Sequence, residues 1–206
     1  APHVSMVAPA VSGSAEITFG GENERTSIYG ITPEYLYVRN YELSEGEFIS
    51  DQQILGRASV VLLGPETAEN LFGHSDGVTG ESVRIEGQPL LVIGVLAPKG
   101  GSAFGSEDAV ALIPISTAKA RLIRRGSDRV DLILVQSVDA DSVAQATDEI
   151  SQILRTRHRT ELGADDFTVF SQQDFVATAQ SITSVLTIFL GGIAGISLLV
   201  GGIGIM

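Results

Sequence analysis

The longest uninterrupted run of apolar residues lies at the C-terminal end of the chain. Residues 185–206 read VLTIFLGGIAGISLLVGGIGIM and contain no charged residue and no Asn or Gln. About 20 apolar residues in a helix rising ~1.5 Å each span the hydrocarbon core of a bilayer, whereas a helix in a soluble core keeps one face polar. The pattern predicts the start of a transmembrane helix. Because no flanking basic residues follow it, we expect the chain to be a piece of a larger membrane protein.

A second helix-forming segment leads directly into this run. From Gln172 onward, apolar residues recur at helical spacing, at Phe175, Val176 and Ala179. No Gly or Pro occurs in 172–190, and these are the residues that most often interrupt a helix. The sequence therefore predicts one continuous helix from the folded part into the membrane, and a rigid helix can transmit force that a flexible linker cannot.

β-Branched and alternating residues predict strands in the N-terminal part. The stretch 4–20 is interpreted as strands with an irregular join, because a proline and a glycine interrupt it. A turn at 20–23 makes a hairpin with the strand that follows. Thr32 before Pro33 indicates a helix start, since Thr caps free N–H groups and Pro lacks one.

The stretch 57–125 predicts short strands alternating with short helices. Its expected elements are a buried strand at 58–64, a helix at 65–72 closed by Gly73, two strands around a turn at 86–88, a glycine-rich loop at 99–108, a strand at 109–115, and a short helix capped by Ser116 that ends at 124–126. Proline at the first helical position and glycine after the last are the usual limits of a helix.

Longer elements are predicted after this stretch. The patterns at 130–138 and 166–170 favour strands. Between them an amphipathic helix is expected to begin at Asp141, with acidic residues early and basic residues late, as the helix dipole favours. Its apolar face consists of Val143, Ala146, Ile150, Ile153 and Leu154.

The charge of the chain excludes one class of partner and orients the folded part. Asp and Glu total 25 against 13 Lys and Arg, a net charge of −12, and an acidic surface repels the phosphate backbone of nucleic acids. No Lys or Arg occurs from Thr160 onward. The positive-inside rule then favours an extracytoplasmic location, periplasmic or extracellular, for the folded part. The absence of Cys excludes disulfides and thiolate metal sites.

The polar residues form no catalytic or metal-binding pattern. His3, His74 and His158 lack metal-ligand spacing and are interpreted as surface residues. Without a phosphate-binding loop, the chain is expected neither to hydrolyse ATP nor to hold a cofactor. The acidic pairs at 107–108 and 165–166 are interpreted as solvated turns, because adjacent strand residues point to opposite sides.

Two features are candidate contact sites. Phe104, in the glycine-rich loop, is either tucked beneath the loop or offered to a partner. Gly191 with Gly195, and Ser197 with Gly201, have the small-xxx-small spacing that suits close helix packing in lipid. The simpler interpretation is that glycine is common in membrane helices.

Five segments in this order resemble one known family. They are YGITPEYLYVRNYELSEGEFIS (29–50), VVLLGPETAENLFG (60–73), GESVRIEGQPLLVIGVLAPKGG (80–101), DDFTVFSQQDF (165–175) and GGIAGISLLVGGIGIM (191–206). Together they resemble the periplasmic core domain of MacB-type ABC transporter permeases, which share their membrane part with FtsX-like proteins. The resemblance covers nearly the whole chain.

The resemblance implies an α+β fold with a divided domain. A porter-like α/β subdomain is expected from both ends of the segment, 1–56 and 126–184. An inserted mixed α/β, sabre-like subdomain is expected at 57–125, and the transmembrane helix at 185–206.

The resemblance also implies a role in transport. Such permeases are homodimeric or paired and have four membrane helices. They are powered by a cytoplasmic ABC ATPase domain or subunit that holds the ATP and Mg²⁺. The external domain is expected to couple ATP hydrolysis to export or efflux by mechanical transmission and by docking a periplasmic membrane-fusion adaptor.

Other functions stay open on the sequence alone. Some FtsX-like relatives activate cell-wall hydrolases, other permeases of the group extract lipoproteins, and nothing in the residues selects the transported substrate. An enzyme held by a C-terminal anchor is the weakest alternative, because the chain shows no catalytic constellation.

Overall fold

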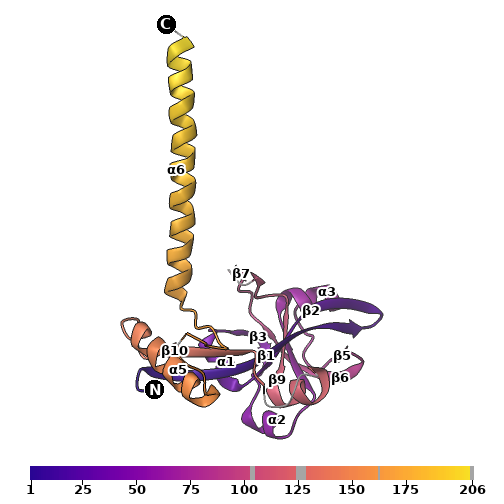
Figure 1. Ribbon diagram of the computed structural model, residues 1–206. Coiled ribbons are helices and arrows are strands. Elements are labelled where there is room, and N and C mark those ends of the chain that lie inside the picture. Colours follow the sequence, from indigo (N-terminus) through magenta and orange to yellow (C-terminus); the bar gives the residue numbers. More distant parts are fainter. Residues whose placement is uncertain (103–104, 124–128, 162, 205–206) are drawn as a thin grey trace. The chain divides into compact units, whose positions relative to one another are not determined.

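The computed structural model describes residues 1–102, 105–123, 129–161 and 163–204 (Figure 1). The chain divides into two compact units, which are treated separately below. One unit is Val4–Val138, here called the sheet unit. The other joins Ala1–His3 to Asp139–Met206 and is called the helical unit.

The sheet unit is built on one mixed sheet of eight strands in the order β10-β1-β2-β9-β4-β6-β3, with β5 pairing to both β1 and β6. The strands are β1 Val4–Phe19, β2 Glu22–Ile31, β3 Leu43–Gly46, β4 Val60–Leu63, β5 Ser82–Ile85, β6 Gln88–Leu96, β9 Val110–Pro114 and β10 Leu132–Ser137. The helices are α1 Pro33–Val38, α2 Asp51–Leu55, α3 Pro65–Phe72, α4 Ile115–Thr117 and the π-helix η1 Ala118–Leu122. A separate two-stranded hairpin consists of β7 Gly101–Ser102 and β8 Gly105–Ser106.

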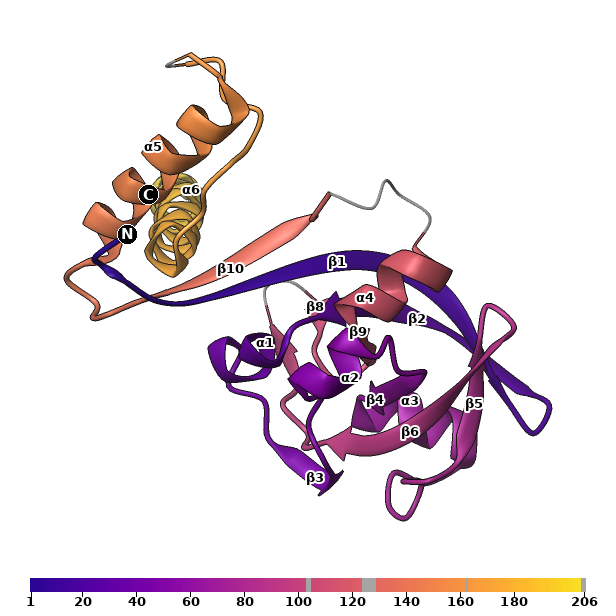
Figure 2. The ribbon, with the colours of Figure 1, turned by 90° about the horizontal axis from the view of Figure 1, so that it is seen from below.

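Strand β1 corrects the expected irregular join at 4–20. It is one strand of 16 residues that pairs with β10 through Val4–Ala10 and with β2 through Val11–Phe19. Its register shifts only near its start, between Val4 and Met6. Pairing with β10 and then with β2 keeps β1 one continuous, curved strand through Pro9 and Gly13, which the sequence pattern treats as interruptions (Figure 2).

The predicted hairpin, the helix at 65–72 and the turn at 86–88 are confirmed, whereas the segment 99–108, expected as a loop, contains the paired strands β7 and β8. Gly20 and Gly21 form the turn between β1 and β2 with φ values of +59° and +102°, as a two-residue hairpin turn requires. Helix α3 ends at Gly73 with φ +78°. Glu86 and Gly87 turn the chain between β5 and β6 with φ values of +48° and +77°.

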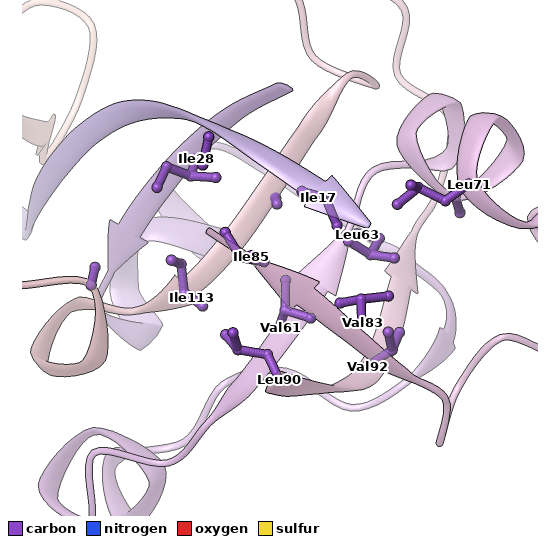
Figure 3. Packing of buried hydrophobic residues seen from close by; sticks show 14 of the residues in the cluster. Ile17, Ile28, Val61, Leu63, Leu71, Val83, Ile85, Leu90, Val92 and Ile113 are labelled. Atoms are coloured by element: carbon purple, nitrogen blue, oxygen red, sulfur yellow. The ribbon is translucent and has the colours of Figure 1, made fainter. Parts of the chain in front are cut away.

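Apolar side chains fill both faces of the sheet. Successive residues of β4 alternate between the faces, so Val61 and Leu63 join one buried cluster and Val60 and Leu62 the other. Figure 3 shows the first cluster, which α3 covers with Leu71. Because helices cover both faces, β4 is an uninterrupted apolar run.

Two predicted helix starts are corrected or refined. Ser116 lies inside α4 rather than at its N-cap, and its Oγ donates to the carbonyl of Ile54 at 2.5 Å; the expected end of this helix at 124–126 lies outside the described residues. Thr32 is the N-cap of α1 with Pro33 following, but its side chain makes no cap hydrogen bond.

The helical unit contains two helices, α5 Val143–His158 and α6 Gln172–Gly204. Helix α5 begins at Val143, with Ser142 as its N-cap, rather than at Asp141 as predicted; the Asp139 carboxylate accepts from the Ser142 N–H at 2.7 Å and holds the chain in a turn before the helix. The strand predicted at 166–170 is wrong. Among the described residues of this unit there is no sheet with which it could pair. Helix α6 is continuous over 33 residues, as predicted.

The predicted domain boundaries stay a prediction, although strand pairing crosses one of them. Strand β2 lies before the boundary at 56/57, yet it pairs in parallel with β9 from the expected insertion. Strand β1 likewise pairs with β5 at Ile17 and Thr18. The two segments therefore share one sheet.

Candidate functional site

Helix α6 exposes apolar side chains along its length. The exposed ones are Val176, Ile182, Val185, Leu186, Ile188, Phe189, Leu190 and Ile193, with Ile188 72% exposed. Within the described residues it is one helix that is long and apolar enough to cross a membrane, with the qualifying span at Gln172–Gly195. By length and composition, α6 can therefore span a lipid bilayer.

The start of α6 is fixed by a reciprocal cap. The Asp174 carboxylate accepts from the N–H and the hydroxyl of Ser171, at 3.0 and 2.8 Å. The Asp174 N–H in turn donates to the Ser171 Oγ at 3.2 Å. These hydrogen bonds lower the pKa of Asp174. Asp174 is also the last charged residue of the chain, so charge and cap mark the same end of the helix.

The predicted packing residues lie on this helix. A Cβ added at Gly191 or Gly195 would meet nothing within 4 Å, so both positions offer open backbone. Ser197 and Gly201 belong to the same continuous helix. Phe104, the candidate partner contact, lies outside the described residues.

A buried ionic cluster is the second notable feature, and it lies in the sheet unit. The Glu107 carboxylate contacts Arg39 Nη2 at 3.0 Å and Lys99 Nζ at 3.1 Å, with its side chain only 11% exposed. Lys99 Nζ also donates to the backbone carbonyl of Arg39. The interpretation of Glu107 as a solvated turn residue is therefore wrong, because two cations enclose its carboxylate.

Three stacked tyrosines surround these charges. The Tyr35 ring lies 6.3 Å from that of Tyr29 and 6.5 Å from that of Tyr41, and Lys99 Nζ lies 4.7 Å from the centre of the Tyr41 ring. Burial raises the pKa of Tyr35 and Tyr41. Burial alone would lower the pKa of Arg39, but Tyr35 and the Glu107 carboxylate together raise it. With these shifts Tyr35 and Tyr41 stay neutral and Arg39 stays charged near neutral pH, which suits a structural cluster rather than a proton-transfer site.

The cluster closes the base of the β7–β8 hairpin. Lys99 precedes β7 and Glu107 follows β8, and both are joined to Arg39 at the end of α1. The Asp108 carboxylate accepts from the N–H groups of Lys99 and Gly100, at 2.8 and 2.9 Å. Sequence spacing gave no sign of this arrangement, because the partners are far apart along the chain.

In the helical unit the second acidic pair is also ion-paired. Arg155 donates to both oxygens of Asp165, at 2.7 and 2.6 Å, and Asp166 contacts His158 at 2.8 Å. His3 contacts Glu149 at 2.6 Å. In the part of the chain that the structure describes, no group of three or more His, Cys, Asp or Glu side chains is placed to hold a metal ion.

Sequence comparisons place these features in a family. The family model of the MacB-like periplasmic core domain matches residues 1–153. A macrolide export ATP-binding/permease protein MacB from Bdellovibrio bacteriovorus is 34% identical over 205 residues, which are 98% of this chain and 31% of that protein. The protein of the same name from Shewanella oneidensis is 32% identical over 211 residues, covering all of this chain and 31% of the relative. The chain thus spans about a third of the length of these relatives.

Solved structures show the same fold. The periplasmic region of MacB from Actinobacillus actinomycetemcomitans matches with a TM-score of 0.73 and 22% identity, covering 87% of this chain and 78% of that one. The extracellular domain of the ABC-type transporter YknZ from Gram-positive bacteria matches with a TM-score of 0.66 and 23% identity, covering 77% and 79%. With the family model covering most of the chain, this chain belongs to the family of MacB-like periplasmic core domains of ABC transporter permeases.

Proposed function

We propose that this chain is the extracytoplasmic domain of a MacB-type export permease and that it works as a mechanical transmitter. The curated relatives are named macrolide export ATP-binding/permease proteins. The chain covers about a third of them, so ATP and Mg²⁺ would be held by an ABC ATPase domain or subunit outside it. On this proposal, export is the work of the whole permease.

Helix α6 is the observation that carries the proposal. It is 33 residues long, about 50 Å at ~1.5 Å per residue. It begins at Gln172, where Ser171 and Asp174 cap its first turn, and no charged residue follows Asp174. A helix of this length reaches from the folded part through the hydrocarbon core of a bilayer. Its unbroken backbone would carry movement of the membrane part to the extracytoplasmic side.

Small residues on α6 support packing against other membrane helices. Gly191 and Gly195 leave the backbone open, and Ser197 with Gly201 repeats their spacing. Close approach of helices at such positions is favourable in lipid. We assign these two pairs of small residues to contact with a second copy or a paired permease subunit.

Docking of a periplasmic membrane-fusion adaptor completes the proposal. The extracytoplasmic side of a permease is where an adaptor would receive substrate and movement. Phe104 is the candidate contact; in the sequence it lies between Lys99 and Glu107, which the ion pairs with Arg39 and Lys99 hold together.

A pair of insertions after Ser181 tests transmission in the full-length permease. Seven flexible residues, GSGSGSG, would interrupt α6, and seven helix-forming residues, AEAAAKA, would lengthen it by about two turns. We expect the flexible insertion to lower macrolide export at least about tenfold while ATP hydrolysis stays within about twofold. The helical insertion should retain most export. Wild-type export with the flexible insertion would contradict transmission through α6.

The membrane placement is tested separately with single cysteines, since the chain has none of its own. Glu86→Cys, in the exposed β5–β6 turn, should react with a membrane-impermeant maleimide on intact cells from which the outer membrane has been removed. Ile188→Cys should stay unreacted until detergent is added. Equal labelling of both would contradict a membrane position for α6.

A further inference from the structure

Three cations of the sheet unit lie on two neighbouring segments and have no carboxylate partner. Arg57 follows α2, and Lys119 and Arg121 lie on η1. The side chains of Arg57 and Arg121 are exposed, and that of Lys119 is partly exposed. In the ranges that the structure describes, none of the three forms an ion pair. These three residues are called the basic surface below.

Hydrogen bonds hold the two segments of the basic surface against each other. Side chains of the segment 116–121 make three hydrogen bonds to the segment 54–59: Ser116 donates to the Ile54 carbonyl at 2.5 Å, Thr117 to the Ala58 carbonyl at 2.8 Å, and Arg121 to the Ser59 hydroxyl at 2.6 Å. Figure 2 shows α2 next to α4, which η1 continues. Arg57 lies directly before Ala58, so these contacts fix its backbone beside η1.

Arg57 adopts a backbone conformation that glycine would adopt more readily. It follows Gly56, the C-cap of α2, and has a φ of +47°. The left-handed position after a helix is usually occupied by glycine. Its N–H donates to the carbonyl of Ile54 at 3.1 Å. The chain therefore keeps an arginine at a strained position, although no described carboxylate pairs with its side chain, and strain of this kind is typical of functional positions.

The segments that carry the basic surface contain no acid. Neither 54–59 nor 115–123 includes Asp or Glu. Asp51 lies at the opposite end of α2, and Glu81 is separated from the first segment by strand β6. The Asp131 carboxylate accepts from a backbone N–H of β1 at 2.9 Å. The positive charge of the basic surface is therefore not neutralised by these neighbours.

The distribution of charge selects the kind of partner. The stretch 119–129 contains five of the 13 Lys and Arg and one acid, in a chain of net charge −12. A wide anionic surface, such as a bilayer or a nucleic acid, would also meet the acidic remainder of the chain and be repelled. A short acidic segment meets only the local surface, because exposed charges beyond a Debye length of about 8 Å are screened.

We propose that the basic surface docks an acidic segment of a partner protein. The proposal rests on the proposed function, which makes this partner the adaptor. Arginine suits the task because its planar guanidinium can bind a carboxylate through two parallel hydrogen bonds. Carboxylates of the partner would also relieve the mutual repulsion of the three cations, and the contact would weaken with salt.

Two labelled 12-residue peptides test the basic surface with the full-length permease in nanodiscs of zwitterionic lipid, after subtraction of the signal from empty nanodiscs. One alternates Glu with Ser, and the other has Gln in place of every Glu. At low salt we expect the Glu peptide to bind at least about tenfold more tightly than the Gln peptide. Arg57→Gly with Lys119→Gln should weaken binding of the Glu peptide at least about fivefold.

The matched control removes two exposed positive charges elsewhere on the sheet unit, by Arg25→Gln on β2 with Arg84→Gln on β5. Its binding of the Glu peptide should stay within about twofold of wild type. Equal binding of the Glu and Gln peptides, or equal losses in the control and the basic-surface variant, would overturn the inference.

A stability measurement separates docking from a structural role of these residues. Glycine suits the φ of Arg57, and loss of the Lys119 charge reduces like-charge repulsion. The double variant should therefore keep or raise the urea midpoint of the chain in detergent while binding falls. A lower midpoint would assign the residues to folding and overturn the inference, unless Lys119→Gln alone weakens Glu-peptide binding at least about twofold at an unchanged midpoint.

Vesicles of phosphatidylglycerol distinguish an acidic protein segment from an anionic membrane. Wild-type permease in zwitterionic nanodiscs should not bind them through the basic surface. Vesicle binding that the double variant abolishes, together with no binding of the Glu peptide, would overturn a protein partner.

Titration of the purified adaptor separates this inference from the proposed function. Loss of adaptor binding in the basic-surface variant, with the control variant unaffected, supports both. Adaptor binding that is the same in wild type and in the basic-surface variant overturns the basic surface as its docking site and leaves the proposed function in place. A wild-type permease that binds the Glu peptide through the basic surface and fails to bind the adaptor overturns adaptor docking alone.

Discussion

The sheet unit and helix α6 use similar apolar residues in opposite ways. In the sheet unit, Leu62 and Leu112 are fully buried between strands and helices of the same chain. On α6, Leu190 and Phe189 are 63% and 64% exposed. Burial of apolar area stabilises a fold only where something covers it. The sheet unit is therefore stabilised by apolar contacts within itself, whereas the apolar surface of α6 requires lipid or another helix to cover it.

The largest expected effect comes from replacing one leucine in each of these two regions by alanine. Leu62→Ala should lower the free energy of unfolding of the sheet unit by about 3 kcal/mol, because it opens a cavity in a fully packed site. Leu190→Ala on α6 should change it by less than about 0.5 kcal/mol. Urea unfolding in detergent followed by tyrosine fluorescence measures this, since all four tyrosines, Tyr29, Tyr35, Tyr37 and Tyr41, lie in the sheet unit. Equal effects would mean that the two regions fold as one body.

A somewhat smaller loss is expected from breaking the ionic cluster of the sheet unit. Glu107→Ala leaves Arg39 and Lys99 partly buried without their carboxylate and should cost about 2 kcal/mol. The double variant Arg39→Met with Glu107→Leu should lose less than the sum of its two single changes, since apolar residues can replace a buried pair. Strict additivity in urea unfolding would show that the pair is not coupled.

Acid should weaken the sheet unit through Glu45, whose counterpart at the start of α6 is Asp174, a carboxyl whose pKa is also lowered by hydrogen bonds. Partial burial alone would raise the pKa of Glu45, but hydrogen bonds from Gly77, Thr79 and Val78 lower it below 4.5. A carboxyl whose pKa is lowered in the folded state stabilises that state above its unfolded pKa and loses the effect as the pH falls through its folded pKa. The contribution should be complete above about pH 5 and decline below about pH 4.5.

Glu45→Gln should remove that decline and lower stability at pH 7 by about 1 kcal/mol. Glu47→Gln is the matched control, since its side chain accepts one hydrogen bond, from Gln53. Unfolding curves at pH 7, 5, 4 and 3 make the comparison. An unchanged acid limb in Glu45→Gln would assign the pH dependence to other groups.

The smallest effect on folding is expected where the small residues of α6 are enlarged. Gly191→Leu with Gly195→Leu should weaken association of the chain in detergent by about 1 kcal/mol, because larger side chains keep helices apart. The stability of the sheet unit should not change. Ser184→Leu is the control on the same helix. Self-association unaffected by the glycine changes would remove these positions from the packing face.

Local signals predicted most of the elements of the sheet unit. Helix α3 was predictable because Pro65 and Gly73 mark its two ends within nine residues. The two-glycine turn after Phe19 and the glycine turn before β6 were predictable for the same local reason. The continuity of α6 follows from the absence of Gly and Pro over 172–190.

Features that depend on distant partners were not predictable. The expected break in β1 failed because β10 and β2 support the strand in succession. The local sequence around Glu107 predicts a turn residue, because its partner Arg39 lies far earlier in the chain and is brought next to it only by the fold. The strand expected at 166–170 had a suitable pattern, and a strand needs a neighbour as well as a pattern.

The pairing of Val4 with Ser137 brings the entry and exit of the sheet unit to the same point. Strands β1 and β10 run antiparallel from there. The two chain segments that connect to the sheet unit therefore attach to it at neighbouring positions. If both attachment points move together, the sheet unit moves as a whole and its β1–β10 hydrogen bonds are not strained. If Val4 and Ser137 are pulled apart, the hydrogen bonds between β1 and β10 would break one after another, starting at Val4. We therefore expect the sheet unit to stay folded when Val4 and Ser137 move together, and to lose β1–β10 pairing when they are pulled apart.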